Sequence, residues 1–174
     1  MAKKMVLGLV LVMMTTAGAF AQQKWYNTYS PCIQGSKALV NVGIGYGSVT
    51  WGSMGIPPIT ASIDFKLKNN PITIGAFGAF STFGGGIFAN YTNIGFGGRA
   101  AYHFNFAKKL DTYVGLSLGY VLQSTDVEWA EGVSFFLWGF NLGARYFFTK
   151  RLGAYLELGY SGLQVASVGL TFKI

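Results

Sequence analysis

Charged residues are scarce in this sequence. They make up 11% of its 174 residues, against a usual share of about a quarter. A soluble domain of this size normally carries more surface charge. Beyond the first segment, no stretch reaches about 18 consecutive apolar residues without a glycine or polar interruption, which disfavours a helical membrane protein. Low charge without long apolar runs leaves strands as the means of burying apolar side chains.

Cysteine and histidine are nearly absent. Cys32 and His103 are the single examples of each, so an internal disulfide is excluded, and the two side chains lie too far apart in sequence to suggest a metal site. Cys32 is either a free thiol or an intermolecular link. We predict neither a metal nor a cofactor.

The first 21 residues have the order of a secretory signal peptide. Lys3 and Lys4 precede an apolar run from residue 5 to about residue 14, and residues 19–21, AFA, place small residues two apart. This run is too short to span a bilayer comfortably, so we predict cleavage before Gln22. A retained membrane anchor is the alternative. Residues 22–37 are predicted to be a periplasmic segment, and residues 38–174 a single domain.

The N-terminal periplasmic segment shows no clear period. It carries three aromatic side chains, Trp25, Tyr26 and Tyr29. We expect these rings either to close the periplasmic end of the domain that follows or to lie at a membrane surface. A plain tether is the alternative.

Glycine and aromatic residues are abundant, and apolar residues alternate with small or polar ones. The sequence has 25 glycines and 17% aromatic residues, and eight stretches of roughly ten residues alternate apolar with small or polar side chains. A period of two places successive side chains on opposite faces of a strand. An apolar face backed by glycine, serine and charge is typical of a barrel with lipid outside and polar packing inside. We therefore predict an all-β, eight-stranded antiparallel up-and-down transmembrane β-barrel after a cleaved signal peptide, with strands at about 38–49, 58–68, 71–81, 92–106, 111–123, 133–148, 151–161 and 164–174.

Turn chemistry sets the register of one hairpin. Asn69 and Asn70 favour a tight connection that pairs Lys66 with Thr73 and Asp64 with Gly75. Short connections alternate with longer ones at about 50–57, 82–91 and 124–132. Short turns face the periplasm in outer-membrane barrels, which predicts that both chain ends are periplasmic. The glycine-rich stretch 82–91 is interpreted as a flexible connection.

The outward face carries aromatic residues near both ends of the strands. A band of Val, Ile and Leu lies between two aromatic rims, as two membrane interfaces require. The rings are Tyr46, Tyr120, Trp138 and Tyr160 near the loops, and Phe65, Tyr102, Phe104, Tyr146, Phe148 and Phe172 near the turns.

The segments IGFGGRAAYHFNF, YVGLSLGY, GFNLGARYFF, GAYLELGY and SVGLTFKI resemble the strands of small eight-stranded outer-membrane barrels of the OmpA/OmpX type. The resemblance covers nearly all of the chain after residue 21. It implies an outer-membrane location and a non-enzymatic structural or surface-interaction role, which is adhesion-like. The implied partners are outer-membrane lipid and lipopolysaccharide and the outer-membrane assembly machinery; an external surface partner stays unknown.

Charges of both signs are expected inside the barrel. The inward faces carry Asp64, Arg99, His103, Arg145 and Glu157, and we predict a structural ionic network because unpaired charges are unfavourable in a narrow interior. An eight-stranded barrel is filled by its own side chains or holds one small ligand. A narrow channel or small-ligand transporter through this lumen is the alternative function. No catalytic residue is predicted, because no nucleophile is placed beside His103 by spacing.

The connection at 124–132 is the candidate surface loop. Asp126, Glu128 and Glu131 surround Trp129 there, and exposed loops on a rigid scaffold are where binding concentrates. A solvated loop without a partner is the alternative. Nucleic-acid binding is excluded because the basic residues form no stripe with interleaved aromatics. A soluble lipocalin-like exported barrel, with the faces reversed, is a third alternative, and the placement of charge disfavours it.

Overall fold

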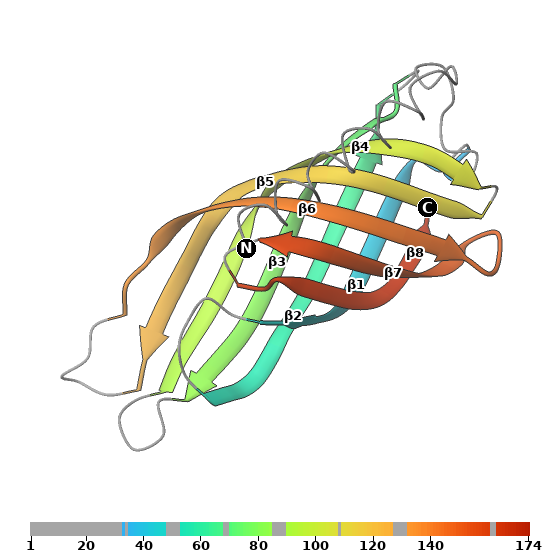
Figure 1. Cartoon of the computed structure of the whole chain (residues 1–174). Coiled ribbons are helices and arrows are strands. Elements are labelled where there is room, and N and C mark those ends of the chain that lie inside the picture. Colours follow the sequence, from blue (N-terminus) through green and yellow to red (C-terminus); the bar gives the residue numbers. More distant parts are fainter. Residues whose placement is uncertain are drawn as a thin grey trace, which may run out of the picture.

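The computed structural model describes residues 33, 35–47, 53–67, 70–84, 90–107, 109–126, 132–160 and 163–174. Within these ranges the chain folds into eight strands that close into one antiparallel barrel (Figure 1). The strands are β1 (Ala38–Tyr46), β2 (Ser53–Lys66), β3 (Ile72–Gly84), β4 (Asn90–Ala107), β5 (Leu110–Thr125), β6 (Phe135–Phe147), β7 (Leu152–Tyr160) and β8 (Ala166–Lys173). The described ranges contain no helix long and apolar enough to cross a membrane.

Strand pairing follows the chain from β1 to β8 and closes between β8 and β1. The first hairpin whose register was predicted has the expected partners, because Lys66 lies opposite Thr73 and Asp64 opposite Gly75. The predicted eight-stranded antiparallel barrel is therefore confirmed. The predicted signal peptide, and the three rings of the segment after it, lie outside the described residues.

Strands β2 to β5 reach further toward the loop end than the alternation predicted, whereas β6 and β8 begin two residues later than predicted. Residues 53–57, 82–84, 90–91 and 124–125 were assigned to connections, but they belong to β2, β3, β4 and β5. Backbone pairing continues there, with Ser53 opposite Gly84 and Thr92 opposite Ser124. Apart from Met54, Ile56, Phe83 and Tyr91, the residues in these parts are glycine, proline or polar, so the apolar period is interrupted although the hydrogen-bonded ladder persists. Reading all of 82–91 as a flexible connection was wrong at both of its ends.

The rim of the barrel is uneven at the loop end. Strands β1, β7 and β8 have 9, 9 and 8 residues, whereas β2 to β6 have 13 to 18. β2 therefore pairs with β1 only as far as Ile59, and β6 pairs with β7 only from Phe140. Pro57 and Pro58 lie in the part of β2 that has no β1 partner, which suits residues that lack an amide hydrogen.

The outer wall of the barrel is apolar. Large aliphatic side chains such as Ile74, Leu116 and Leu142 are exposed along its middle. Aromatic side chains are exposed near both ends, with Tyr146 and Phe172 near the short turns and Tyr46, Tyr120, Trp138 and Tyr160 near the loops. A wall of this kind suits lipid and not water, so the barrel is transmembrane and the inside-out soluble alternative is rejected.

Glycines on the inner face make room for two tyrosine rings. Tyr113 on β5 lies opposite Gly143 on β6, and a methyl group at Gly143 would overlap the Tyr113 ring. Tyr155 on β7 lies opposite Gly169 on β8, and a methyl group there would come within 2.8 Å of the Tyr155 ring. Each ring therefore covers the bare backbone of the next strand.

We expect Gly143→Ala to destabilise the barrel by about 1–3 kcal/mol, because the added methyl group displaces the buried Tyr113 ring. Gly98→Ala is the matched control, since the nearest atom to a methyl group there lies 3.8 Å away, and its effect should stay within about 0.5 kcal/mol. Denaturant unfolding of both variants in lipid vesicles measures the difference. Equal effects would show that the Tyr113 ring is free to move aside.

Candidate functional site

The turn end of the interior is closed by an apolar cluster. Ile33, which precedes the first strand, packs there with Leu39 of β1 and Phe147 of β6, and all three are buried. The Lys173 ammonium lies 3.7 Å from the centre of the Phe147 ring, a cation–π distance. Ile33 thus helps to fill the turn end of the lumen.

Arg145 is at the centre of the charged layer above this cluster. Its side chain is fully buried. One guanidinium nitrogen lies 2.6 Å from Asp64, the other lies 3.0 Å from Asp111, and Nε donates to Asn41 at 3.1 Å. The Tyr113 ring covers one face of the guanidinium, with its centre 4.0 Å from Cζ. Each of the three guanidinium nitrogens of Arg145 therefore has an acceptor, as its planar fork allows.

Arg99 joins the same layer from the opposite side of Asp64. Its Nε lies 3.1 Å from the second carboxylate oxygen of Asp64, and a terminal nitrogen lies 2.7 Å from Glu157. The Asn141 amide also donates to Glu157. Asp64 therefore bridges both arginines, and the network extends from β2 across to β7.

The network links most of the barrel wall. Its charged members come from β2, β4, β5, β6 and β7, and Asn41 adds β1. Two guanidinium groups face three carboxylates, and the His103 imidazole lies against one of the carboxylates. In a low-dielectric interior each group depends on its partners, because an uncompensated buried charge is strongly destabilising.

His103 has the neighbours of a catalytic base, and it is buried together with them. Its Nδ1 lies 2.9 Å from Asp111, and its Nε2 lies 2.9 Å from the Thr73 hydroxyl. The order hydroxyl, imidazole, carboxylate is that of a hydrolytic triad. All three side chains are buried, Arg145 binds the same Asp111 carboxylate, and none of the three lines the cavity described next. The geometry holds the imidazole in place.

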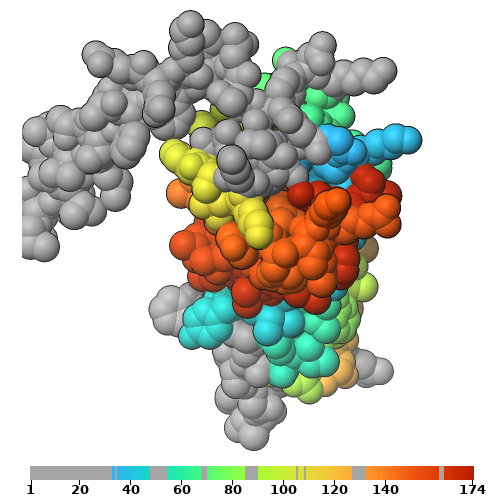
Figure 2. All heavy atoms as spheres, turned by 90° about the vertical axis from the view of Figure 1, so that its right-hand side faces the viewer, coloured from blue at the N-terminus to red at the C-terminus, as the bar shows by residue number. Residues whose placement is uncertain are grey.

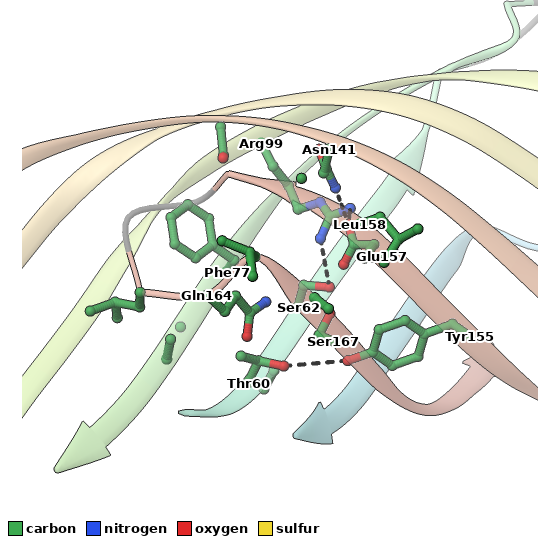
Figure 3. A pocket seen from close by; sticks show the side chains of 18 residues that line it. Thr60, Ser62, Phe77, Arg99, Asn141, Tyr155, Glu157, Leu158, Gln164 and Ser167 are labelled. Atoms are coloured by element: carbon green, nitrogen blue, oxygen red, sulfur yellow. Dashed lines mark hydrogen bonds and ion pairs between the residues drawn. The ribbon is translucent and has the colours of Figure 1, made fainter. Parts of the chain in front are cut away.

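A cavity of about 50 Å³ lies on the loop side of the network (Figure 3). The Arg99–Glu157 pair, Ser62 and Asn141 form its polar side, and the Thr60 and Tyr155 hydroxyls lie 3.3 Å apart beside it. Phe77 and Leu163 contribute apolar walls. This volume is enough for a few water molecules, since each needs at least about 10–15 Å³ on such a measure.

A second apolar cluster lies above the cavity. Val121, Leu137 and Leu163 are buried together, with Phe77 and Phe135 packed against them. Leu163 comes from the connection between β7 and β8, so a loop residue enters the barrel. The interior is therefore layered, with apolar packing at both ends and the ionic network and cavity between.

The structure brings together the five inward residues singled out in the sequence, and it adds Asp111 and Tyr113. Both had a usable signal, since they share the inward parity of Ser117 on the same strand. Asp111 was overlooked because it follows directly after a turn, where a charged residue is ordinarily solvated.

Only part of the predicted surface loop can be placed. Asp126 is exposed, and Glu128, Trp129 and Glu131 lie outside the described residues. The Asp126 carboxylate accepts hydrogen bonds from the backbone and side-chain nitrogens of Asn90, at 2.9 and 2.7 Å. These bonds hold the pKa of Asp126 below its usual range. Asp126 thus ties the end of β5 to the start of β4.

Solved structures that match this fold include bacterial outer-membrane barrels and a designed transmembrane barrel. No family model and no curated protein sequence matches the chain. The Ail protein, the attachment invasion locus protein of Yersinia pestis, matches at a TM-score of 0.53 with 12% identity, over 79% of this chain and 95% of that one. Neisserial surface protein A matches at 0.51 with 15% identity, over 79% and 94%. A de novo designed transmembrane β-barrel matches at 0.52 with 15% identity, over 81% and 98%. At these identities the likeness shows the fold.

Proposed function

We propose that this chain, which has the fold of the small eight-stranded outer-membrane barrels, is a non-enzymatic outer-membrane protein whose barrel is a closed scaffold for its loops. The layered interior carries the proposal. The Arg145 and Arg99 ion pairs cross the lumen, and apolar clusters around Phe147 and Leu137 lie at either end. A lumen filled in this way stabilises the wall and leaves the loops as the place for recognition.

The loops are then the surface-interacting part, in an adhesion-like role. The tall wall from β2 to β6 carries the connection that begins at Asp126, and the sequence adds Glu128, Trp129 and Glu131 to it. An acidic loop whose sequence includes a tryptophan suits a partner that offers cations and an apolar surface. Yersinia pestis Ail, named for attachment and invasion, has the same fold, which is compatible with such a role.

Location and partners are part of the same proposal. The apolar wall with aromatic rims requires lipid on all sides, and the matched folds favour the outer membrane, with its phospholipid, lipopolysaccharide and assembly machinery as partners. Short connections between β2 and β3, β4 and β5, and β6 and β7 support a periplasmic position for both chain ends. Residues 1–21 are proposed to be the export signal, and residues 22–37 a periplasmic segment.

A narrow conduit is the second candidate function, favoured by the cavity beside Arg99 and Glu157. Movement of this ion pair would connect the cavity to the layer below it. The passage would still have to cross the clusters around Leu137 and Leu39, which is why the scaffold is preferred.

Single-channel recording of the refolded protein in a planar bilayer separates the two functions. We expect no discrete currents from the wild-type barrel, because the ion pairs and both apolar clusters block the lumen. Heat-modifiable migration on a gel serves as the control for folding. Discrete currents that change in Arg145→Ala and Glu157→Ala would overturn the scaffold and support the conduit.

A further inference from the structure

Exposed charge is sorted by sign between the two ends of the barrel. Among the described residues, Asp64, Asp111 and Glu157 point into the interior, whereas the turn end carries six basic residues: Lys37, Lys66, Lys109, Lys150, Arg151 and Lys173. The turn connections 67–71, 107–109 and 148–151 contain no Asp or Glu. The remaining acidic residues all fall in the single connection from 126 to 131. The turn end is therefore strongly positive.

The turn between β6 and β7 holds two of these cations at a fixed tip. The Thr149 hydroxyl accepts hydrogen bonds from the backbone N–H groups of Arg151 and Leu152, at 3.2 and 2.8 Å. The Thr149 amide also donates to the Leu152 carbonyl, at 3.1 Å. Such bonds define a tight turn. Lys150 and Arg151 consequently project together into solvent.

A groove of about 500 Å³ runs beside this tip. It is lined by Lys150, Arg151, Lys173 and Ile174 and by the small residues Gly35 and Ser36. Figure 2 shows this end of the molecule, where the orange chain of the β6–β7 region lies beside the red end of β8 and the blue residues that lead into β1. Three basic side chains thus border one hollow.

Three exposed aromatic residues of the outer wall are close in the chain to the basic residues that line the groove. Tyr146 and Phe148 precede the turn directly, and Phe172 lies opposite Leu152, the first residue after it. All three rings face outward and belong to the turn-side aromatic rim, which marks a membrane interface. The site is therefore amphipathic, with cations toward water and rings toward the apolar wall.

We propose that the groove at the β6–β7 turn binds the phosphodiester headgroup of an anionic phospholipid in the leaflet that faces this end. Lys150 and Arg151 contact the phosphate, and the acyl chains lie along Phe148 and Phe172. A lipid is favoured over a soluble anion because the rings continue the site into the hydrocarbon region, where a free phosphate gains nothing. The inference goes beyond the scaffold role and holds whether or not the lumen conducts.

Native mass spectrometry of the full-length barrel in detergent tests this site. The protein is titrated with phosphatidylglycerol and, in parallel, with phosphatidylcholine of the same chain length. We expect wild-type protein to retain phosphatidylglycerol preferentially and Lys150→Gln/Arg151→Gln to bind it about thirtyfold more weakly, since each cation near an anionic lipid surface contributes roughly a factor of five. Glycerol phosphate, the soluble headgroup, should not displace the bound lipid at equal concentration.

The matched control is Lys66→Gln/Lys109→Gln. It removes the same charge from the same end but leaves the groove intact, so its affinity for phosphatidylglycerol should fall less than about threefold by longer-range electrostatics alone. Equal losses in the two double variants, or no preference for phosphatidylglycerol over phosphatidylcholine, would overturn the site. If glycerol phosphate displaced the bound lipid, the proposal of a lipid site would be wrong, and the ligand would be a soluble anion.

Discussion

Replacing Arg145 with alanine is expected to destabilise the barrel by about 3–5 kcal/mol, because removing one partner leaves a buried charge uncompensated. Here two carboxylates, Asp64 and Asp111, lose the cation that lies 2.6 and 3.0 Å from them. The Tyr113 ring also loses its stacking partner. Guanidinium-induced unfolding in lipid vesicles, followed by tryptophan fluorescence, measures the change.

Two further variants separate charge from geometry. Arg145→Met combined with Asp111→Asn should recover much of the lost stability, because one uncompensated carboxylate is removed along with the cation. Arg151→Ala, at the exposed turn, should change stability by less than about 0.5 kcal/mol. An Arg145→Ala barrel as stable as Arg151→Ala would show that the ionic network contributes nothing to the fold.

Leu116→Arg is expected to destabilise the barrel in lipid by about 2–4 kcal/mol, the effect of a cation at the bilayer midplane on the lipid face. Leu116 is 63% exposed in the middle of β5 and lies between Ala100 and Phe140 on the outward face. The measurement is again denaturant unfolding in vesicles. On a water-facing wall, the same change would be harmless.

Leu122→Arg is the matched control for depth. It lies on the same face of the same strand, six residues nearer the loops, and beyond Tyr120 of the loop-side aromatic rim. Its effect should be about 0–1 kcal/mol, because the guanidinium reaches the interface. If both arginines were tolerated equally, the outer wall would not be facing hydrocarbon.

Much of the fold follows from a single local property. Alternation assigns each side chain to one face without any knowledge of its partners, and it correctly separated outward Leu156 and Leu158 from inward Tyr155 and Glu157. The register that the Asn69–Asn70 pair predicted for β2 and β3 is the one observed, with Lys66 opposite Thr73. Strand ends were predicted less well, because the loop-side ends of β2 to β5 hold mainly glycine, proline and polar residues, which interrupt the apolar alternation.

The candidate site was predictable as a set of inward charges, but not as a set of contacts. Parity places Arg99 and Arg145 inside, yet which carboxylate each one reaches depends on how strands far apart in sequence meet across the lumen. Asp111 shows the limit, since its role depends on being buried beneath Arg145 and not on its neighbours in the chain. Leu163 is similar, because only the closed barrel brings that connection against Val121.

The pairing of β1 with β8 bears on how the molecule folds. Every other strand pair joins consecutive strands, so seven hairpins can form from local contacts, whereas this seam runs from Leu39 opposite Lys173 to Tyr46 opposite Ala166. Pairing two segments separated by nearly the whole domain loses more loop-closure entropy than any other strand pairing in the barrel. Such non-local contacts slow folding. We therefore expect the β1–β8 seam to form last, after the tall β2–β6 wall. We also expect its closure to limit the folding rate of the barrel.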